Sequence, residues 1–390
     1  MTADPADSRV PDRPHWAARA ENVKNRQVVR LLRLLRWQVR LQPFHGYGVP
    51  GNVRILAKAL YAVPSAPADF HDQPVHDMRT MAVRGWRSFT SQVSPYCPVL
   101  IRAGNEEFTV RADRSGIIDV VLPITLPPGR HEVYLSTDQG NAVTATVWVV
   151  DPETTHGLVS DIDDTVMVTW LPRPLLAFWN AFVIHQSSRR VVPGMPMLYQ
   201  RFARENPDAL IVYLSTGAWN VFPVLQRFLY KNGYPEGPLL LTDWGPTNSG
   251  LFRSGIEHKD RSLAELAAMF PAVRWLLVGD DGQHDPQIYT RFAAEHEHQV
   301  SAVAIRQLTE YEQVLSHGSR RRGAPWRGFP RRNADRPGGT RAAPRSGPAR
   351  ASRPRHQPHR PAIPRIRSPF AVSPDGHGLL AALRRHGILR

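Results

Sequence analysis

Acidic side chains cluster directly after a short apolar run in the middle of the chain. Gly157–Val159 leads, through a serine, into Asp161, Asp163, Asp164 and Thr165. A strand that ends in carboxylates presents them at its carboxyl end, where open α/β sheets bind ligands. Carboxylates this close repel one another unless a cation or a proton relieves them, and magnesium suits such oxygen ligands. The alternative is an Asp-rich turn that only ends the strand.

Three later stretches place further reactive groups at a strand end or a helix start. They contain Ser215 and Thr216, then Lys259, and then Asp280, Asp281 and Asp285. Hydroxyls at a strand end suit a phosphoryl oxygen, although Ser-Thr-Gly is also ordinary turn chemistry. A lysine at a helix start is unfavourable against the dipole unless an anion is near, and a solvated lysine is the alternative. Together these groups predict one crevice, because parallel strands end at the same edge.

Strand and helix patterns alternate from about residue 151, which predicts a parallel sheet with helices on both faces. The expected strands are 157–162, 210–215, 238–241, 275–279 and 300–305, and the expected helices are 194–205, 220–232, 260–269, 286–296 and 308–316. This order predicts a five-stranded, doubly wound α/β domain over residues 151–317, which is large enough to bury its own core.

Residues 37–150 follow a period of two instead. Six short alternating segments lie at 53–57, 99–103, 108–111, 118–122, 131–135 and 145–149, and Gly-containing turns separate most of them. Short strands at this spacing predict an antiparallel, β-sandwich-like domain.

The net charge of +15 is unevenly distributed. Residues 319–390 hold 18 Arg, no Lys and two Asp, a net charge of +16, so the rest of the chain sums to −1. We expect residues 318–390 to form an Arg/Pro-rich disordered tail, with a short helix at Leu379–Arg385 as a candidate exception. Arg clusters bind anionic surfaces, either lipid or nucleic acid, and the composition does not choose between them.

The N-terminal region is also basic in part. Residues 1–14 are predicted to be disordered, and residues 15–36 have a helical period with a basic stripe that includes Arg26, Arg30 and Arg33. This amphipathic helix either packs on the next domain or lies on anionic lipid through its basic side. A single cysteine suits a reducing compartment, and no signal peptide or membrane-length apolar run is visible. We therefore expect a cytoplasmic protein that contacts membranes only peripherally.

The reactive residues, taken in order, resemble the four motifs of the haloacid dehalogenase superfamily of phosphohydrolases. The matching residues are Asp161-x-Asp163-x-Thr165, then Ser215, then Lys259, then Gly279-Asp280 with Asp285. Over about residues 151–310 the chain resembles the catalytic domain of the actin-patch-protein type of phosphatidate phosphatase. The segments that carry this resemblance are Ser160–Val166, Ala218–Asn220, Gly237–Leu241 and Gly282–Tyr289.

Two positions depart from that family pattern. Asp281 stands where the family usually has a serine, and Gly217-Ala218 stands where it usually has Ser-Pro before the Trp-Asn pair. Neither change removes a catalytic group, but both could alter the choice of substrate. A looser similarity extends upstream to Gly46-Tyr47-Gly48, and none extends into the tail.

The resemblance implies roles for the first acid cluster. Asp161 would be the nucleophile and would form an aspartyl-phosphate. Asp163 would protonate the leaving oxygen and later activate water. Magnesium would be held by Asp161, the backbone carbonyl of Asp163, and Asp280.

The remaining residues would bind phosphate or support the site. The phosphoryl oxygens would be bound by Ser215, Thr216 and Lys259. Supporting contacts to the metal, to the lysine or within the loop would come from Thr165, Asp281 and Asp285.

These observations predict a magnesium-dependent phosphomonoester hydrolase acting on phosphatidate or a related lipid phosphate. The stretches from Thr165 to Ile211 and from Ser215 to Lys259 are too short to hold a large cap domain, so the site would suit a phosphate on a bulky carrier. The aromatic segment 170–184 either packs into the core or dips into lipid as a flap. The alternatives are a phosphatase for phosphoproteins or nucleic-acid ends, which is less favoured, and a non-catalytic module that binds anionic surfaces.

Overall fold

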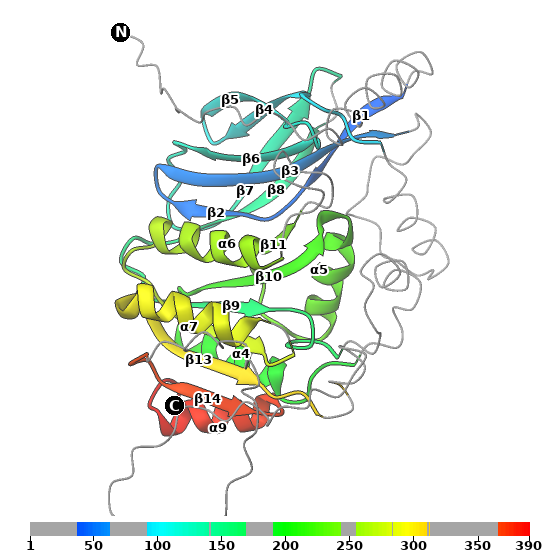
Figure 1. The fold of residues 1–390 in the computed structure, drawn as a ribbon. Coiled ribbons are helices and arrows are strands. Elements are labelled where there is room, and N and C mark those ends of the chain that lie inside the picture. The colour runs from blue at the N-terminus through cyan, green and yellow to red at the C-terminus, as the bar shows by residue number, and fades with distance from the viewer. Residues whose placement is uncertain are drawn as a thin grey trace, which may run out of the picture.

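The computed structural model describes residues 37–62, 92–139, 142–168, 190–242, 255–282, 284–309, 312 and 366–390. The predictions for residues 1–36, for the segment 170–184 and for residues 318–365 lie outside these ranges. The strands of the described part form two sheets, which Figure 1 shows one above the other.

The first sheet lies N-terminal in the chain and contains the six predicted strands and two more. Its strands are β1 (Gln38–Pro43), β2 (Gly46–Val49), β3 (Asn52–Ala62), β4 (Pro98–Ala103), β5 (Glu106–Arg111), β6 (Ile117–Leu122), β7 (Gly129–Thr137) and β8 (Ala142–Val149). They follow the order β1-β3-β2-β8-β7-β4-β5, with β6 paired to β3. Their inward side chains form a separate core that includes Ile55, Ile101 and Val147.

This sheet is mixed, so the prediction of a wholly antiparallel arrangement is wrong. The short strand β2 pairs with β8 in parallel and with β3 in antiparallel. Two glycines allow this fit, because a Cβ at Gly46 would lie 2.5 Å from the carbonyl oxygen of Arg54, and one at Gly48 would lie 2.2 Å from that of Asn52. A short glycine-rich strand has no apolar alternation, which is why the sequence pattern did not indicate it.

The second sheet is the predicted parallel one, and in the described part it has six strands. They are β9 (His156–Asp161), β10 (Leu210–Ala218), β11 (Leu239–Thr242), β12 (Arg274–Asp280), β13 (Val300–Arg306) and β14 (Phe370–Ser373), in the order β11-β10-β9-β12-β13-β14. Its connecting helices are α4 (Met195–Glu205), α5 (Phe222–Lys231), α6 (Gly255–Met269) and α7 (Asp285–Glu295).

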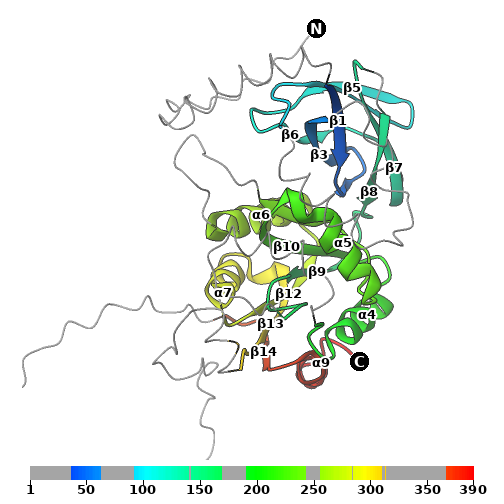
Figure 2. The same cartoon turned by 90° about the vertical axis from the view of Figure 1, so that its right-hand side faces the viewer.

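Figure 2 shows α6 and α7 on one face of this sheet and α4 and α5 on the other. The prediction of helices on both faces is therefore confirmed. The fifth expected helix, 308–316, falls largely outside the described residues. Among the helices of the described ranges, none is both long and apolar enough to cross a membrane.

The end of the chain is ordered, which corrects the prediction of a disordered tail for residues 366–390. β14 extends the sheet by pairing with β13, and α9 (Gly376–Arg385) packs against β14, β13 and α4. Leu379 and Leu383, four residues apart, are fully buried, and Asp375 accepts a hydrogen bond from Gly378 N (2.8 Å) to cap α9. The candidate helix at Leu379–Arg385 is confirmed within α9, whereas β14 was not predicted.

The two sheets contact each other through the start of the first one. The ring of Phe44 stacks on Trp219 with centroids 4.2 Å apart, and the His45 ring bonds to the carbonyl oxygen of Gly237 (3.0 Å). Arg54 adds an ion pair to Glu265 on α6 (2.6 Å). The first sheet thus packs directly against the elements that carry the candidate site.

Candidate active site

β9 ends in Asp161 at the middle of the parallel sheet, and a tight turn follows it. β9 lies between β10 and β12, so this carboxylate projects from a central strand. The carbonyl oxygen of Ile162 accepts three successive backbone N–H groups, the shortest from Val166 at 3.0 Å. Asp164 has φ 57°, a left-handed conformation uncommon for residues other than glycine. We call residues 161–167 the acidic loop.

Four further side chains reach the same edge from different elements. Asp280 is the last residue of β12, Ser215 lies near the end of β10, Lys259 lies near the start of α6, and Asp285 begins α7. All four are buried. They meet because parallel strands end at one edge and the helices that follow begin there. The single crevice predicted from sequence is therefore present.

Lys259 is the centre of this cluster. Its Nζ donates to Asp161 Oδ1 (2.6 Å) and to Asp285 Oδ1 (2.5 Å), and both side chains of each pair are at most 2% exposed. Asp285 in turn accepts a hydrogen bond from the backbone N–H of Asp280 (3.4 Å). Asp285, predicted to contact the metal from its outer shell or to contact the lysine, thus lies in direct contact with the lysine and the neighbouring acid.

Burial and mutual repulsion set the protonation of this cluster. Burial, together with Asp285 and Asp163, raises the pKa of Asp161 to about 8, although Lys259 opposes the shift. Burial and the surrounding carboxylates raise the pKa of Asp280 well above its usual range. Burial lowers the pKa of Lys259, but the two carboxylates outweigh it and the net shift is upward. One lysine does not balance the acids, so the site favours an added cation.

The acidic residues fit a divalent cation. Carboxylate oxygens of Asp161, Asp280 and Asp285 lie within 4.8 Å of one another. Asp161 Oδ2 and Asp280 Oδ2 are buried and have no hydrogen-bond partner among the described residues. Buried carboxylate oxygens are costly when unpaired, and an oxygen-rich set is the one that magnesium prefers.

A second contact joins the acidic loop to β10. Ser215 Oγ donates to Asp163 Oδ2 (3.1 Å) and accepts from the backbone N–H of Gly217 (3.0 Å). Asp163 Oδ1 is buried without a partner in the described part. The carboxyl of Asp163 thus contacts a hydroxyl beside the cluster rather than the lysine.

Three other predicted residues lie near the site in different roles. Thr165 Oγ1 is buried and has no hydrogen-bond partner among the described residues. Thr216 is half-buried beside the first residue of α6. Asp281 accepts a hydrogen bond from Leu308 N (2.8 Å), whereas the ion pairs of Lys259 go to the other acids. The contact of Asp281 therefore fixes the chain after β13.

Sequence reasoning missed the residues that hold the acidic loop. Tyr234 Oη donates to the carbonyl oxygen of Val166 (2.8 Å), and Arg306 Nη1 donates to that of Asp164 (2.7 Å). Both side chains come from segments distant in the chain. Arg306 had a signal, because it ends an apolar strand at the predicted edge; Tyr234 had none.

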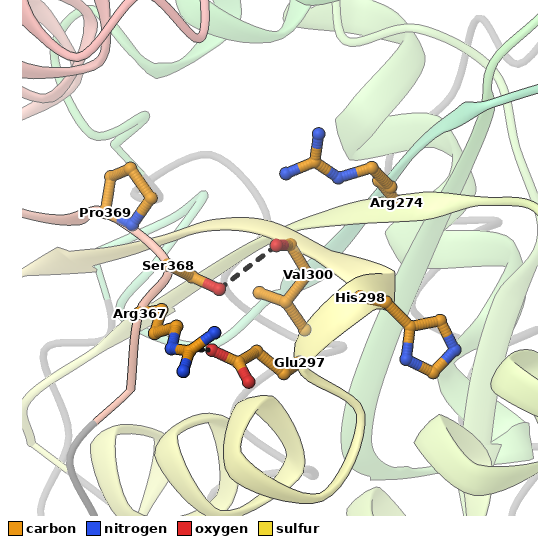
Figure 3. Close-up of a pocket in the computed structure, with 7 residues that line it drawn as sticks. All are labelled: Arg274, Glu297, His298, Val300, Arg367, Ser368 and Pro369. Carbon is orange, nitrogen blue, oxygen red and sulfur yellow. Dashed lines mark hydrogen bonds and ion pairs between the residues drawn. The ribbon is translucent and has the colours of Figure 1, made fainter.

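A separate hollow of about 460 Å³ lies at the opposite edge of the sheet (Figure 3). Its lining includes Arg274 and Val300, the first residues of β12 and β13, and Arg367, which pairs with Glu297 (3.1 Å). Parallel strands that end in the acid cluster must begin at the other edge. This hollow is therefore not part of the candidate active site.

Together, the parallel sheet and its acid, hydroxyl and lysine edge form an α/β domain with a candidate active site. Residues 156–307 match the family described as "Phosphatidate phosphatase APP1, catalytic domain". This part of the chain is therefore similar to a catalytic domain of that type. The predicted resemblance to a phosphatidate phosphatase catalytic domain is thereby confirmed.

Two curated relatives match the chain over parts of their length. Phosphatidate phosphatase APP1 of Saccharomyces cerevisiae is 30% identical over 151 residues, which cover 38% of this chain and 25% of that protein. An uncharacterized protein of Schizosaccharomyces pombe is 23% identical over 212 residues, which cover 52% of this chain and 35% of that one. The chain thus spans only about a quarter to a third of these relatives.

One similarity to a solved structure is weak. A carbohydrate acetylesterase from Xanthomonas citri has a TM-score of 0.26 at 13% identity and covers 70% of this chain and 60% of its own. A likeness this low carries no conclusion about fold or function.

Proposed function

We propose that the protein is a magnesium-dependent phosphomonoester hydrolase of the haloacid dehalogenase superfamily that acts on phosphatidate or a related lipid phosphate. One observation carries the chemistry. The carboxylate of Asp161 ends the central strand of the sheet, paired with the buried Lys259 and beside buried acid oxygens without partners. Transfer of a phosphoryl group to Asp161 would use this carboxylate as the nucleophile, the lysine as a fixed positive charge, and a metal bound by the unpaired acid oxygens.

The residues of the site divide the reaction between them. With phosphate bound at Ser215 and Lys259, an Asp161 carboxylate oxygen attacks phosphorus and the bond to the leaving oxygen breaks. The protonated Asp163 gives its proton to that oxygen, so the alcohol leaves neutral. Water then attacks the aspartyl-phosphate, Asp163 takes a proton from the water, and the bond between phosphorus and Asp161 breaks to release inorganic phosphate.

The same acids would hold the metal. Asp161, Asp280 and the backbone carbonyl of Asp163 would bind it, with Asp285 beside them. Magnesium, when bound, supplies positive charge that stabilises the transferring phosphoryl group. The carboxyl of Asp163 stays available for proton transfer because its contact is with Ser215.

Three features support a lipid substrate. The family and the yeast relative carry the name of a phosphatidate phosphatase. The undescribed stretches 169–189 and 243–254 are too short for a cap domain, so a phosphate on a bulky surface would have access. Residues 319–365 carry a net charge of +13, which would attract an anionic surface such as a membrane. We propose a cytoplasmic protein that contacts membranes peripherally.

The direct test is phosphate release from a panel of phosphatidate, a phosphopeptide and a 3′-phosphorylated oligonucleotide, with magnesium and with a chelator. We expect magnesium-dependent release from phosphatidate and none from Lys259→Met, which controls for contaminating phosphatases. Release from the peptide or the oligonucleotide alone would contradict the lipid assignment. Release from none of them would indicate a non-catalytic binding module.

The basic segment can be tested without disturbing the fold. All 14 arginines of residues 319–365 are replaced by glutamine at unchanged length, which keeps β14 and α9 in the chain. Each arginine near an anionic surface contributes about 1 kcal/mol, so binding to anionic vesicles should fall steeply at low salt and less at high salt. Hydrolysis of a short-chain soluble phosphatidate should not change. Unaltered vesicle hydrolysis would show that this segment is no membrane tether.

A further inference from the structure

Arg306 joins the acidic loop to the end of the chain. It is the last residue of β13 and only 4% exposed. Its Nη1 donates to the carbonyl oxygen of Asp164 (2.7 Å), its Nε to that of Pro374 (3.1 Å), and its Nη2 to Glu312 Oε1 (2.6 Å). Each of the three guanidinium nitrogens thus has a partner in a different segment of the chain.

The carbonyl that Arg306 holds belongs to a residue with an unusual backbone. Asp164 has φ 57°, so the orientation of its peptide groups depends on the contacts that fix it. The other anchor of the acidic loop, from Tyr234 to Val166, lies two residues further along. Between Asp161 and that anchor, the contact with Arg306 fixes the loop from the β13 side.

The acidic loop carries the two proposed catalytic acids in different ways. Asp161 belongs to β9 and pairs with Leu214 in the parallel ladder, so the sheet itself fixes it. Asp163 lies beyond the strand and directly precedes the residue that Arg306 holds. Its side-chain contact is with Ser215. A shift of the Asp164 peptide would therefore move Asp163 and leave Asp161 in place.

The C-terminal segment gives Arg306 its fixed support. Arg306 lies opposite Ser373 in the pairing of β13 with β14, and Gln307 N donates to the Ser373 carbonyl oxygen (2.9 Å). Gly376 N donates to the carbonyl oxygen of Pro193 (2.8 Å), which ties the segment to the chain before α4. Pro374, the acceptor of Arg306, lies between these two attachments.

We propose that Arg306 is a positioning residue for the general acid: it fixes the Asp164 peptide, supported by the C-terminal segment, and so keeps Asp163 in place to protonate the leaving oxygen. This inference rests on the proposed function. It assigns a role in the reaction to residues 366–390, which lie beyond the segment that matches the family. Removal of Arg306 should impair departure of poor leaving groups more than attack on phosphorus.

The test compares leaving groups in Arg306→Gln. An alkyl phosphate needs a proton on its leaving oxygen, whereas p-nitrophenyl phosphate leaves as a stable anion. General acid catalysis contributes about 10²–10⁴-fold. We therefore expect kcat/KM for the alkyl phosphate to fall about 100-fold and that for p-nitrophenyl phosphate to fall less than about fivefold. Arg306→Lys keeps the charge without the three-pronged geometry and should recover part of the loss.

Gln299→Leu is the matched control. Gln299 is also buried, and its Nε2 donates to the carbonyl oxygens of Ala267 (3.1 Å) and Phe270 (3.2 Å). It precedes β13 at the other edge of the sheet, so its loss should destabilise the fold without a leaving-group effect. Equal losses on both substrates in Arg306→Gln, as expected of this control, would overturn the positioning role.

Amide hydrogen exchange separates this inference from the proposed function. The backbone N–H groups of Thr165, Val166 and Met167 are bonded within the acidic loop, and their exchange should accelerate in Arg306→Gln but not in Gln299→Leu. If the wild type hydrolyses no phosphomonoester, the proposed function is wrong and exchange still reports on the loop. If the enzyme is active but loop exchange is unchanged, the positioning role is wrong. Should Arg306→Gln fail to fold, Arg306→Lys carries both measurements.

Discussion

Two buried cations in this molecule have ion-pair partners of the same kind and number, but the surroundings of the two differ. Lys259 and Arg54 each pair with two carboxylates. The Arg54 guanidinium bonds both oxygens of Asp119 (2.6 and 2.7 Å), the hydroxyl of Tyr47 (2.7 Å) and Glu265 (2.6 Å). Its three nitrogens all have acceptors, and both acids are about one-third exposed.

The surroundings of Lys259 are unbalanced by comparison. Its two partners are essentially unexposed, two more acids lie beside them, and three carboxylate oxygens of the cluster have no hydrogen-bond partner in the described part of the chain. Burial raises the pKa of Asp161 to about 8. A satisfied network such as that of Arg54 stabilises structure, whereas an unsatisfied one costs stability and indicates a ligand. The predictions below test this distinction.

The largest effect should follow Asp161→Asn. The amide keeps the shape of the carboxylate but cannot attack phosphorus, so kcat should fall by roughly three orders of magnitude or more. The free energy of unfolding should not decrease, because the substitution removes a carboxylate that burial and the neighbouring acids destabilise. Steady-state kinetics and urea denaturation measure the two quantities.

The matched control applies the same change to the other network. Asp119→Asn removes one carboxylate charge from the surroundings of Arg54. It should leave kcat within about threefold of wild type, because Asp119 lies on β6 of the first sheet and not at the acidic edge. Retention of a tenth of wild-type activity in Asp161→Asn would contradict the covalent mechanism.

Asp280→Asn should have the next largest effect. It removes one of few charged ligands, so the magnesium concentration for half-maximal activity should rise about 10–100-fold while KM for substrate at saturating magnesium changes little. Titration of activity with magnesium measures the shift. Activity that is unchanged by a chelator would remove the metal assignment altogether.

The sequence sufficed for five of the six strands of the parallel sheet in the described part and for the reactive edge of that sheet. Apolar runs ending in Asp161, Ser215 and Asp280 placed these side chains at strand ends, and parallel strands bring such ends together. It also singled out Lys259, because a lysine at a helix start is unfavourable unless an anion is near, although a solvated lysine remained the alternative. In the structure Lys259 pairs with Asp161 and Asp285. These predictions succeeded because each depends on local pattern and on one topological rule.

The sequence failed where contacts link distant segments. The pairing of β14 with β13 depends on a fit between residues more than sixty positions apart, which no local period encodes. The same is true of the contacts that Arg306 and Tyr234 make with the acidic loop. Their acceptors are backbone carbonyl oxygens, which every residue type has, so the sequence does not mark them. The parallel pairing of β2 depends on two glycines that have no side chains to clash with β3. In the sequence, closely spaced glycines look like a loop rather than a strand.

The smallest effect on activity is expected from Arg54→Gln, which tests the satisfied network. Loss of the guanidinium removes the two-pronged bond to Asp119 and the link to Glu265 on α6. Because these acids are about one-third exposed, water will solvate them in part, and the free energy of unfolding should fall by about 1–3 kcal/mol rather than by the larger cost of a fully buried orphaned charge. Arg102→Gln is the control, since its pair with Glu107 is well exposed and should contribute less than about 1 kcal/mol.

Activity in Arg54→Gln should stay within about threefold of wild type when assayed below the unfolding transition. Lys259 keeps both of its own ion pairs, and α6 remains packed through the buried Leu263 and Leu266. Urea denaturation followed by kinetics on the folded protein checks both halves. A loss of 100-fold in kcat with an intact fold would show that the first sheet sets the position of Lys259 through Glu265. The two buried cations would then belong to one functional unit, and the separation of a structural from a catalytic network would be wrong.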